Sequence, residues 1–343
     1  MNQNRRAFLN RIFGTSCGYV ASLSFAPRHA RRAYARDSLQ PELAKQPFAR
    51  IEQLAPDVYA LISTPFTIDG KAGDLSTHSN GGLIVGRDRI LAIDSYRTPA
   101  GARFMAEASL KLTGRLPTHV VTTHFHFDHL GGTTAFIAKG AVPETIMTQT
   151  TRKLAYSAYG KSGEKDESGP FSTPTLTKWG GRFLDASRVI SDETKPVTLD
   201  LGGRTVTIVP MSGHTGSDLV VIDDETGTTF GGDLLWDDIF PKFMSSLPSQ
   251  WRANIAKLTK GESRLMVPGH GSVQRSDSQS FELFSNLHNE IERYAREQHA
   301  KGNSANNAAQ TFSLPQSLGD WNYFRAGFHE IAMDAWYREL NDH

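Results

Sequence analysis

The six residues from His124 to His129, His-Phe-His-Phe-Asp-His, constrain this chain more than any other stretch. Four of the six can bind a metal, and they directly follow the apolar, strand-like run 120–123. Crowding imidazoles and a carboxylate into one loop costs desolvation and repulsion, which a bound transition metal offsets. Side chains two apart at a strand end point the same way, so His124 and His126 can converge on one ion. Asp128 and His129 then turn away and are left for a second ion. A polar loop without a metal is the alternative.

Three further metal-binding side chains each follow a strand-like run and lie beside a glycine. They are His214, Asp233 and His270, after the runs 205–209, 228–230 and 264–267. Glycine lets the backbone approach an ion closely and adopt the dihedral angles of tight turns. Taken singly, each residue is best interpreted as a structural side chain. Together they repeat one pattern of strand, glycine turn and ligand, which predicts that they complete the coordination begun by the loop.

The sequence around these residues forms a set of motifs. They are the run from His124 to His129, Gly213-His214-Thr215, Gly232-Asp233 and Pro268-Gly269-His270, with the hairpin-like stretches 80–86 and 90–95 upstream. The set resembles the metallo-β-lactamase superfamily, over roughly residues 50–275. The resemblance implies an α/β fold, a four-layer αββα sandwich.

The resemblance also implies a ligand set for two metals. His124, His126 and His214 would hold the first ion, Asp128, His129 and His270 the second, and Asp233 would bridge them. We expect two Zn²⁺ per chain, with iron or manganese as alternatives. Asp94 would support the ligand loop, as an outer partner that fixes the orientation of an imidazole. The alternative for Asp94 is a turn residue that caps a strand end.

A dinuclear zinc centre predicts metal-assisted hydrolysis. Zinc lowers the pKa of bound water toward about 7, from about 15.7 in bulk, so a bridging hydroxide can attack a carbonyl carbon at neutral pH. Asp128 is the expected catalytic residue, which orients the hydroxide or relays its proton. A bridging hydroxide needs no serine nucleophile, and the Gly-x-Ser-x-Gly pattern of serine hydrolases occurs only at 14–18, outside the metal-binding motifs. We therefore expect hydrolysis of an ester, lactone, thioester or amide/lactam bond in a small molecule.

Two alternative activities follow from the same resemblance. One is a β-lactamase, but the antibiotic-hydrolysing branches typically carry cysteine or serine where this chain has Asp233. An aspartate there is more similar to thioesterase, lactonase and other hydrolase branches. The other alternative resembles the persulfide dioxygenases, in which counterparts of His124, His214 and Asp233 hold a single iron. A non-catalytic binding module would be expected to lack a ligand, and this chain lacks none.

Residues 1–35 predict an export signal. The run from Asn4 to Leu9, Asn-Arg-Arg-Ala-Phe-Leu, resembles a twin-arginine motif, a weakly apolar segment spans 12–26, and Ala33-Tyr34-Ala35 offers a small-x-small cleavage site. We therefore expect a periplasmic protein that engages the twin-arginine export machinery. A disordered basic tail and a signal for the general secretion route are the alternatives.

Composition excludes several partners. The predicted signal holds six arginines and no acid, so its removal lowers the 37 basic residues to 31 against 36 acidic ones. A mildly acidic remainder does not suggest nucleic-acid binding. No run approaches the roughly 18 apolar residues of a membrane span. The single cysteine, Cys17, lies in the predicted signal, so no disulfide or thiolate ligand is expected after cleavage. The oligomeric state is not predicted.

The remaining sequence predicts one large domain with an extension. We expect a linker over 36–50, the main domain over 51–275 and a C-terminal helical extension of it over 276–343. Thr98 and Pro99 predict the start of a helix that runs to 112. In the extension, a polar linker is expected over 301–310, between two helices.

Two aromatic groups are predicted to line a substrate pocket. Tyr156 and Tyr159 belong to 150–196, an insertion that becomes rich in glycine and proline and that we interpret as a lid or pocket wall. The alternative is an insertion anchored by its aromatic side chains on the outer surface. Trp236, Phe240 and Phe243 follow Asp233 closely, although core packing is expected for some of them.

Overall fold

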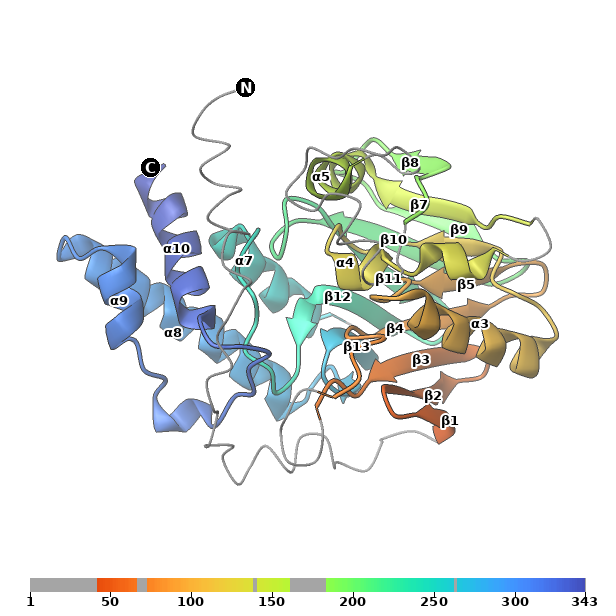
Figure 1. Ribbon diagram of the computed structural model, residues 1–343, viewed down its shortest axis with the longest axis horizontal. Helices are drawn as coiled ribbons and strands as arrows, with labels where there is room; N and C mark the ends of the chain where they lie inside the picture. The colour runs from red at the N-terminus through yellow and green to blue at the C-terminus, as the bar shows by residue number, and fades with distance from the viewer. Residues whose placement is uncertain (1–41, 67–72, 138–140, 161–182, 262–263, 343) are drawn as a thin grey trace.

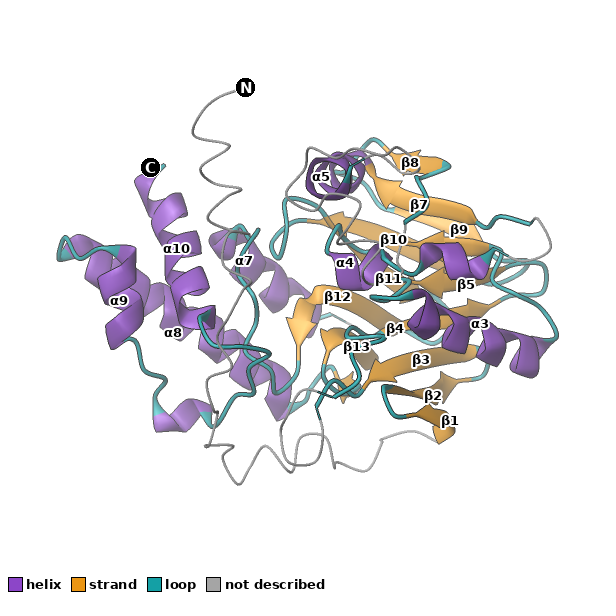
Figure 2. Ribbon diagram, viewed as in Figure 1, coloured by secondary structure: helices purple, strands orange, loops and turns teal. Residues whose placement is uncertain are grey.

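Two mixed β-sheets lie face to face, with helices on their outer surfaces (Figure 1, Figure 2). The computed structural model describes residues 42–66, 73–137, 141–160, 183–261 and 264–342. The apolar layer between the sheets includes Ile62, Val121, Val221 and Phe230, all with side chains at most 1% exposed. The predicted α/β sandwich is therefore confirmed.

The first sheet has eight strands in sequence order. They are β1 (Glu42–Gln46), β2 (Ala49–Ala55), β3 (Val58–Ser63), β4 (Gly81–Val85), β5 (Ile90–Ile93), β6 (His119–Val121), β7 (Glu144–Thr148) and β8 (Arg188–Ile190). Strands β1 to β5 pair antiparallel, whereas β5 to β8 pair parallel. The carboxyl ends of β5 and β6 therefore meet at one edge, where Asp94 and the 124–129 loop emerge.

The second sheet has six strands in the order β14-β13-β12-β11-β10-β9. They are β9 (Val197–Asp200), β10 (Thr205–Met211), β11 (Asp218–Asp223), β12 (Thr228–Trp236), β13 (Leu265–His270) and β14 (Gln274–Arg275). All neighbours pair antiparallel except β12 and β13, which are parallel. Asp233 lies within β12 and His270 ends β13, so both predicted ligands are part of strands rather than of the turns after them.

The helices cover the outer faces. They are α3 (Pro99–Thr113), α4 (Phe127–Leu130), α5 (Gln149–Tyr159), α7 (Pro248–Thr259), α8 (Gln279–Ala300), α9 (Ala305–Thr311) and α10 (Phe328–Asn341), with short 3-10 turns at Thr133–Phe136 and Gln316–Leu318. Thr98 caps α3 as predicted, since its Oγ1 accepts a hydrogen bond from Gly101 N at 3.4 Å. Helix α8 buries Phe281, Phe284 and Leu287 in a core that it shares with α7, α10 and β12.

Two local predictions are wrong. The stretch 36–50, expected to be a linker, contains β1 and the start of β2, because these residues pair along the edge of the first sheet. The stretch 301–310, also expected to be a linker, contains most of α9, whose Ala308 and Ala309 pack into the core. No helix in the described part of the chain is long and apolar enough to cross a membrane. The predicted export signal at 1–35 lies outside the described residues.

Candidate metal centre

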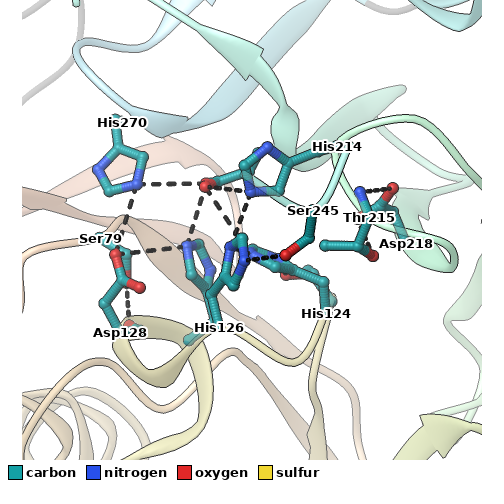
Figure 3. A network of polar contacts seen from close by, with 12 residues as sticks. Ser79, His124, His126, Asp128, His214, Thr215, Asp218, Ser245 and His270 are labelled. Atoms are coloured by element: carbon teal, nitrogen blue, oxygen red, sulfur yellow. Dashed lines mark hydrogen bonds and ion pairs between the residues drawn. The ribbon is translucent and has the colours of Figure 1, made fainter. Parts of the chain in front are cut away.

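The seven side chains predicted as ligands come together where the two sheets' strand ends meet (Figure 3). They form two groups, the first of His124, His126, His214 and Asp233, and the second of Asp128, His129 and His270. Within each group, one candidate ligand atom of each residue lies within 4.8 Å of those of the others. Residues separated by up to 146 positions in the sequence thus converge as the pattern predicted.

Three imidazole nitrogens face one another in the first group. His126 Nδ1 lies 2.9 Å from His214 Nε2 and 3.1 Å from His124 Nε2. Burial lowers the pKa of all three side chains, so they are neutral and present lone pairs. A neutral imidazole has only one N–H, so three converging nitrogens cannot all satisfy one another. A cation between them would satisfy all three, because neutral imidazole is the metal-binding form.

The second group gathers around the other oxygen of the Asp233 carboxylate. Oδ1 lies 3.0 Å from His129 Nε2 and 3.3 Å from His270 Nε2, whereas Oδ2 lies 3.1 Å from His214 Nε2 in the first group. Asp128 Oδ2 lies 3.5 Å from His270 Nε2 and 3.9 Å from His129 Nε2. Buried Asp233 Oδ1 and His129 Nε2 form no hydrogen bond of normal geometry with any described residue. Both atoms therefore fit a bound metal.

Both carboxylates at the centre are ionised. Burial alone would raise the pKa of Asp233, but the surrounding histidines lower it well below its usual range. Burial alone would also raise the pKa of Asp128. A hydrogen bond from His78 and the charge of His129 outweigh it and lower this pKa well below its usual range. Despite its burial, His129 has a pKa that Asp233 and Asp94 raise well above its usual range, so this imidazole would give up its proton to a bound metal. Ionised carboxylates and neutral imidazoles are then the donor set that zinc, iron and manganese take.

Asp94 holds one ligand from behind. His129 Nδ1 lies 2.7 Å from Asp94 Oδ2, and the Asp94 carboxylate also accepts hydrogen bonds from Thr123 N at 2.7 Å and Thr123 Oγ1 at 2.9 Å. With Nδ1–H held in this way, His129 Nε2 is left to face the centre. Asp94 has a φ of 59°, directly after β5, so it is also a turn residue. Both alternatives for Asp94 therefore describe the same arrangement.

A close backbone approach fixes Asp233 against β13. A Cβ atom at Gly269 would overlap Asp233 Oδ1, so only glycine fits there. Asn80 ties the opposite sheet to the same turn, because its Nδ2 donates to Pro268 O at 2.9 Å and to Gly271 O at 2.8 Å. The two sheets are thus joined at the metal-binding edge.

Comparison with known proteins identifies the family. The family model for the metallo-beta-lactamase superfamily matches residues 77–270, which is more than half of the chain. The chain belongs to the metallo-β-lactamase superfamily. It retains the histidine and aspartate clusters of a metal site.

Individual relatives are distant. An acyl-coenzyme A thioesterase of Gallus gallus is 25% identical over 186 residues, which cover 50% of this chain and 63% of that protein. A double mutant of the sec-alkyl sulfatase PisA1 superposes with a TM-score of 0.62 at 16% identity, over 84% of this chain and 50% of that one. A metallo-β-lactamase from Erythrobacter litoralis superposes with a TM-score of 0.55 at 18% identity, over 73% of this chain and 100% of that one. This chain thus spans less than two thirds of the first two relatives, and the two structural likenesses establish the fold alone.

Two residues at the superfamily site were not predicted from the sequence. His78 Nδ1 lies 2.9 Å from Asp128 Oδ2, and the backbone oxygen of His78 lies 3.1 Å from His270 Nδ1. Ser79 Oγ donates to the backbone oxygen of Asp128 (Figure 3). His78 lies in a loop before β4, at a φ of 63°, and follows no strand. Its only sequence signal was its place just before the Asn80-Gly81-Gly82 motif.

The C-terminal extension reaches the same site. The ring of Phe324 lies 4.4 Å from that of His78 and 5.1 Å from that of His270, between ring centroids. The ring of Trp236 lies 4.1 Å from that of His270 and 6.0 Å from that of Phe324, between ring centroids. Ser245 Oγ lies 3.4 Å from His126 Nε2. The segment before α7 in the sequence and the segment after α8 therefore both contact the histidines of the centre.

The structure divides the predicted pocket residues. Phe240 and Phe243 are fully buried, which makes core packing their role, because α7, α8 and α10 cover them. Trp236 is 2% exposed and touches a predicted ligand. Tyr159 lies on α5 with its ring 5.6 Å from that of Phe127, and Tyr156 lies on the same helix. A pocket role for these two tyrosines stays a prediction, since residues 161–182 of the predicted lid lie outside the described residues.

Proposed function

We propose that this protein is a hydrolase that binds two zinc ions and cleaves the ester or thioester bond of a small molecule. The single observation that supports this most strongly is the position of Asp233. Its Oδ2 faces His214 and His124 of the first group and its Oδ1 faces His129 and His270 of the second, so one carboxylate serves both groups. A mononuclear site would not need the second group to be assembled.

The spacing of the first group suits zinc. Ligand atoms at about 2.0–2.1 Å from a tetrahedral zinc are roughly 3.3 Å apart from one another. The separations here are 2.9 and 3.1 Å from His126 Nδ1 to the other two histidines, and 3.1 and 3.7 Å from Asp233 Oδ2 to His214 and His124. The donor set therefore fits with small adjustments.

The residues around the centre divide the work of hydrolysis. When bound, the ions would lower the pKa of water and polarise the substrate carbonyl. We assign the handling of the water proton to Asp128, whose side chain is 18% exposed, whereas those of His129, His270 and Asp233 are at most 3% exposed. The hydrogen bond from His78 fixes the orientation of this carboxylate and keeps it ionised. Trp236 and Phe324 exclude water from one side of His270.

The choice of ester and thioester over β-lactam rests on two features. Asp233 stands where the antibiotic-hydrolysing branches typically carry cysteine or serine, and Leu234, Leu235 and Trp236 follow instead of a nearby lysine. The relative from Gallus gallus is named an acyl-coenzyme A thioesterase, which supports a thioester, although the match covers only 63% of it.

Metal analysis together with a substrate panel tests this proposal. We expect about two zinc ions per chain, and faster turnover of an acyl thioester or a 4-nitrophenyl ester than of a chromogenic cephalosporin. The panel also includes a lactone, because the sequence predicted lactones among the possible substrates. One iron per chain with oxygen consumption on a persulfide would overturn the proposal in favour of a dioxygenase. Preferred turnover of the cephalosporin would overturn it in favour of a β-lactamase.

We also propose that the protein is exported through residues 1–35. The support is the arginine pair Arg5 and Arg6, the weakly apolar segment and the Ala33-Tyr34-Ala35 site. The full chain, expressed in a bacterium with a twin-arginine pathway, should be recovered from the periplasm. Lysine at both positions 5 and 6 should keep it in the cytoplasm. Equal export of the two forms would contradict the twin-arginine route.

A further inference from the structure

One side of the metal centre is open to solvent. The side chain of His78 is 21% exposed and that of its partner Asp128 is 18% exposed, whereas the other six predicted ligands are buried. A substrate therefore reaches the centre past these two side chains. The residues that border this open side decide which substrates fit.

An aromatic wall, made of Phe66, Trp236 and Phe324, borders the open side. The Phe324 ring lies 4.4 Å from that of His78 and 5.1 Å from that of His270, between ring centroids. It stacks on Phe66 at 5.2 Å and 14°, and it meets Trp236 at 6.0 Å. Trp236 and His270 are each 2% exposed, whereas Phe66 and Phe324 are half-buried. The wall thus runs from a buried ligand to the open side, where part of its apolar surface faces solvent.

Hydrogen bonds hold Phe324 in this place. The backbone N and the Nδ2 of Asn322 both donate to Asp238 O at 3.0 Å, and Asn322 O accepts a hydrogen bond from Phe240 N at 2.8 Å. The ring of Tyr323 stacks on that of Phe240 at 5.1 Å between centroids. These contacts fix the segment before Phe324 against the loop that follows β12. The wall is therefore preorganised, and a ligand that covers it loses little free energy to ordering the protein.

Two of the three residues of the aromatic wall lie outside the segment that matches the superfamily. Phe66 precedes residues 77–270, and Phe324 follows them in the C-terminal extension. The metal ligands all lie within that segment. The wall is thus added to the shared metal centre by the parts of the chain that flank it.

We propose that the aromatic wall binds the apolar acyl chain of the substrate. An alkyl chain laid on Phe324 and Phe66 would cover apolar surface that otherwise faces water. The acyl chain is the better occupant than the leaving group, because the departing thiol or alcohol has to escape into solvent. The enzyme then prefers esters and thioesters with an alkyl chain, such as hexanoyl, over those of acetate. This inference rests on the proposed hydrolase function and adds its substrate class.

Two thioesters of one small, polar thiol test the preference. They are the acetyl and hexanoyl thioesters of N-acetylcysteamine, which differ only in the acyl chain, and a chromogenic thiol reagent follows their cleavage. The zinc-loaded full chain should cleave the hexanoyl thioester with a kcat/KM about tenfold higher or more, because burying even half of the additional methylene groups supplies that factor. Equal kcat/KM values, or a higher value for the acetyl thioester, would overturn the inference.

Variants at position 324 separate recognition of the chain from structure. Phe324→Ala should lower kcat/KM for the hexanoyl thioester about fivefold or more and change that for the acetyl thioester less than about twofold. Phe324→Leu should retain most of the preference, because it keeps an apolar surface. Phe312→Ala is the matched control, since the Phe312 ring packs on Tyr294 and His329 in the same extension, and it should leave the preference unaltered. An equal loss on both thioesters in Phe324→Ala would show that this ring only supports His270, and would overturn the inference.

Binding of the two product carboxylates distinguishes this inference from the proposed function. If the protein cleaves neither thioester, calorimetry of the zinc-loaded full chain with sodium acetate and sodium hexanoate still tests the aromatic wall. About tenfold tighter binding of hexanoate, lost in Phe324→Ala, would support the wall while the proposed hydrolysis falls. Equal binding of the two ions, or the same preference for hexanoate in Phe324→Ala, would overturn the wall as well.

Discussion

Replacing Asp94 by asparagine tests how the second metal group is held. In the structure, Asp94 Oδ1 accepts from Thr123 N, while Oδ2 faces two groups, Thr123 Oγ1 and His129 Nδ1. Asparagine can keep the first hydrogen bond through its carbonyl oxygen. Its amide nitrogen would then replace the oxygen that faces His129 Nδ1–H, and two donors would oppose each other. His129 would rotate or take the other tautomer, which places a proton on Nε2.

The expected loss is largest at the second metal. Mutation of such an outer partner typically weakens metal binding by about 10- to 100-fold, or roughly 1.4–2.8 kcal/mol. His124, His126 and His214 do not contact Asp94 through a hydrogen bond, so the first metal should keep most of its affinity. Turnover should fall with occupancy of the second site.

Titration of metal-free protein with zinc, in competition with a chromogenic chelator, resolves the two binding steps. Asp223→Asn is the matched control, because Asp223 is a fully buried aspartate whose partners are Arg204 and Thr226, away from the ligands. Only Asp94→Asn should lower the zinc affinity of the weaker of the two binding steps. Unchanged binding in Asp94→Asn, or an equal loss in Asp223→Asn, would refute the reasoning.

Three further perturbations have definite expected results. His288 is buried among aromatic rings without a hydrogen-bond partner among the described residues, and burial lowers its pKa to about 3. Unfolding raises that value to about 6.5, so stability is complete above pH 6.5 and is lost as the pH falls toward 3. Between pH 6.5 and 4.5 the metal-free chain should lose about 2 kcal/mol more than His288→Leu in denaturant titrations. Parallel pH profiles of the two proteins would count against this. His78→Phe removes the hydrogen bond to Asp128 and should lower kcat about tenfold, with first-group zinc retained on metal analysis; an unaltered kcat would leave His78 without a role. Chelation of zinc that was present at about 1,000 times its Kd should lower Tm by about 8 °C or more in a calorimetric scan, whereas an unchanged Tm would argue that the folded state binds no metal.

The ligands were predictable because each one is marked locally. A strand, a glycine and a metal-binding side chain recur at His214, Asp233 and His270, and strand periodicity alone aligns His124 with His126. The sheet sandwich followed from the same motifs. In physical terms, the chemistry of the donors and the geometry of strand ends are both short-range properties of a sequence.

The surroundings of the site depend on contacts that sequence spacing does not reveal. His78 meets Asp128 across 50 positions, and Phe324 arrives from the C-terminal extension. Phe240 and Phe243 follow a ligand closely in sequence, yet α7, α8 and α10 bury them in the core. Helix α9 was missed because its sequence is polar and its stability comes from packing on α10.

Anomalous diffraction at the zinc absorption edge, from crystals of the zinc-loaded protein, tests the central claim most directly. Two peaks should lie on opposite sides of the Asp233 carboxylate, one among the first-group histidines and one beside Asp128, His129 and His270. A single peak, with the second group left without metal, would contradict the dinuclear centre and the mechanism that depends on it.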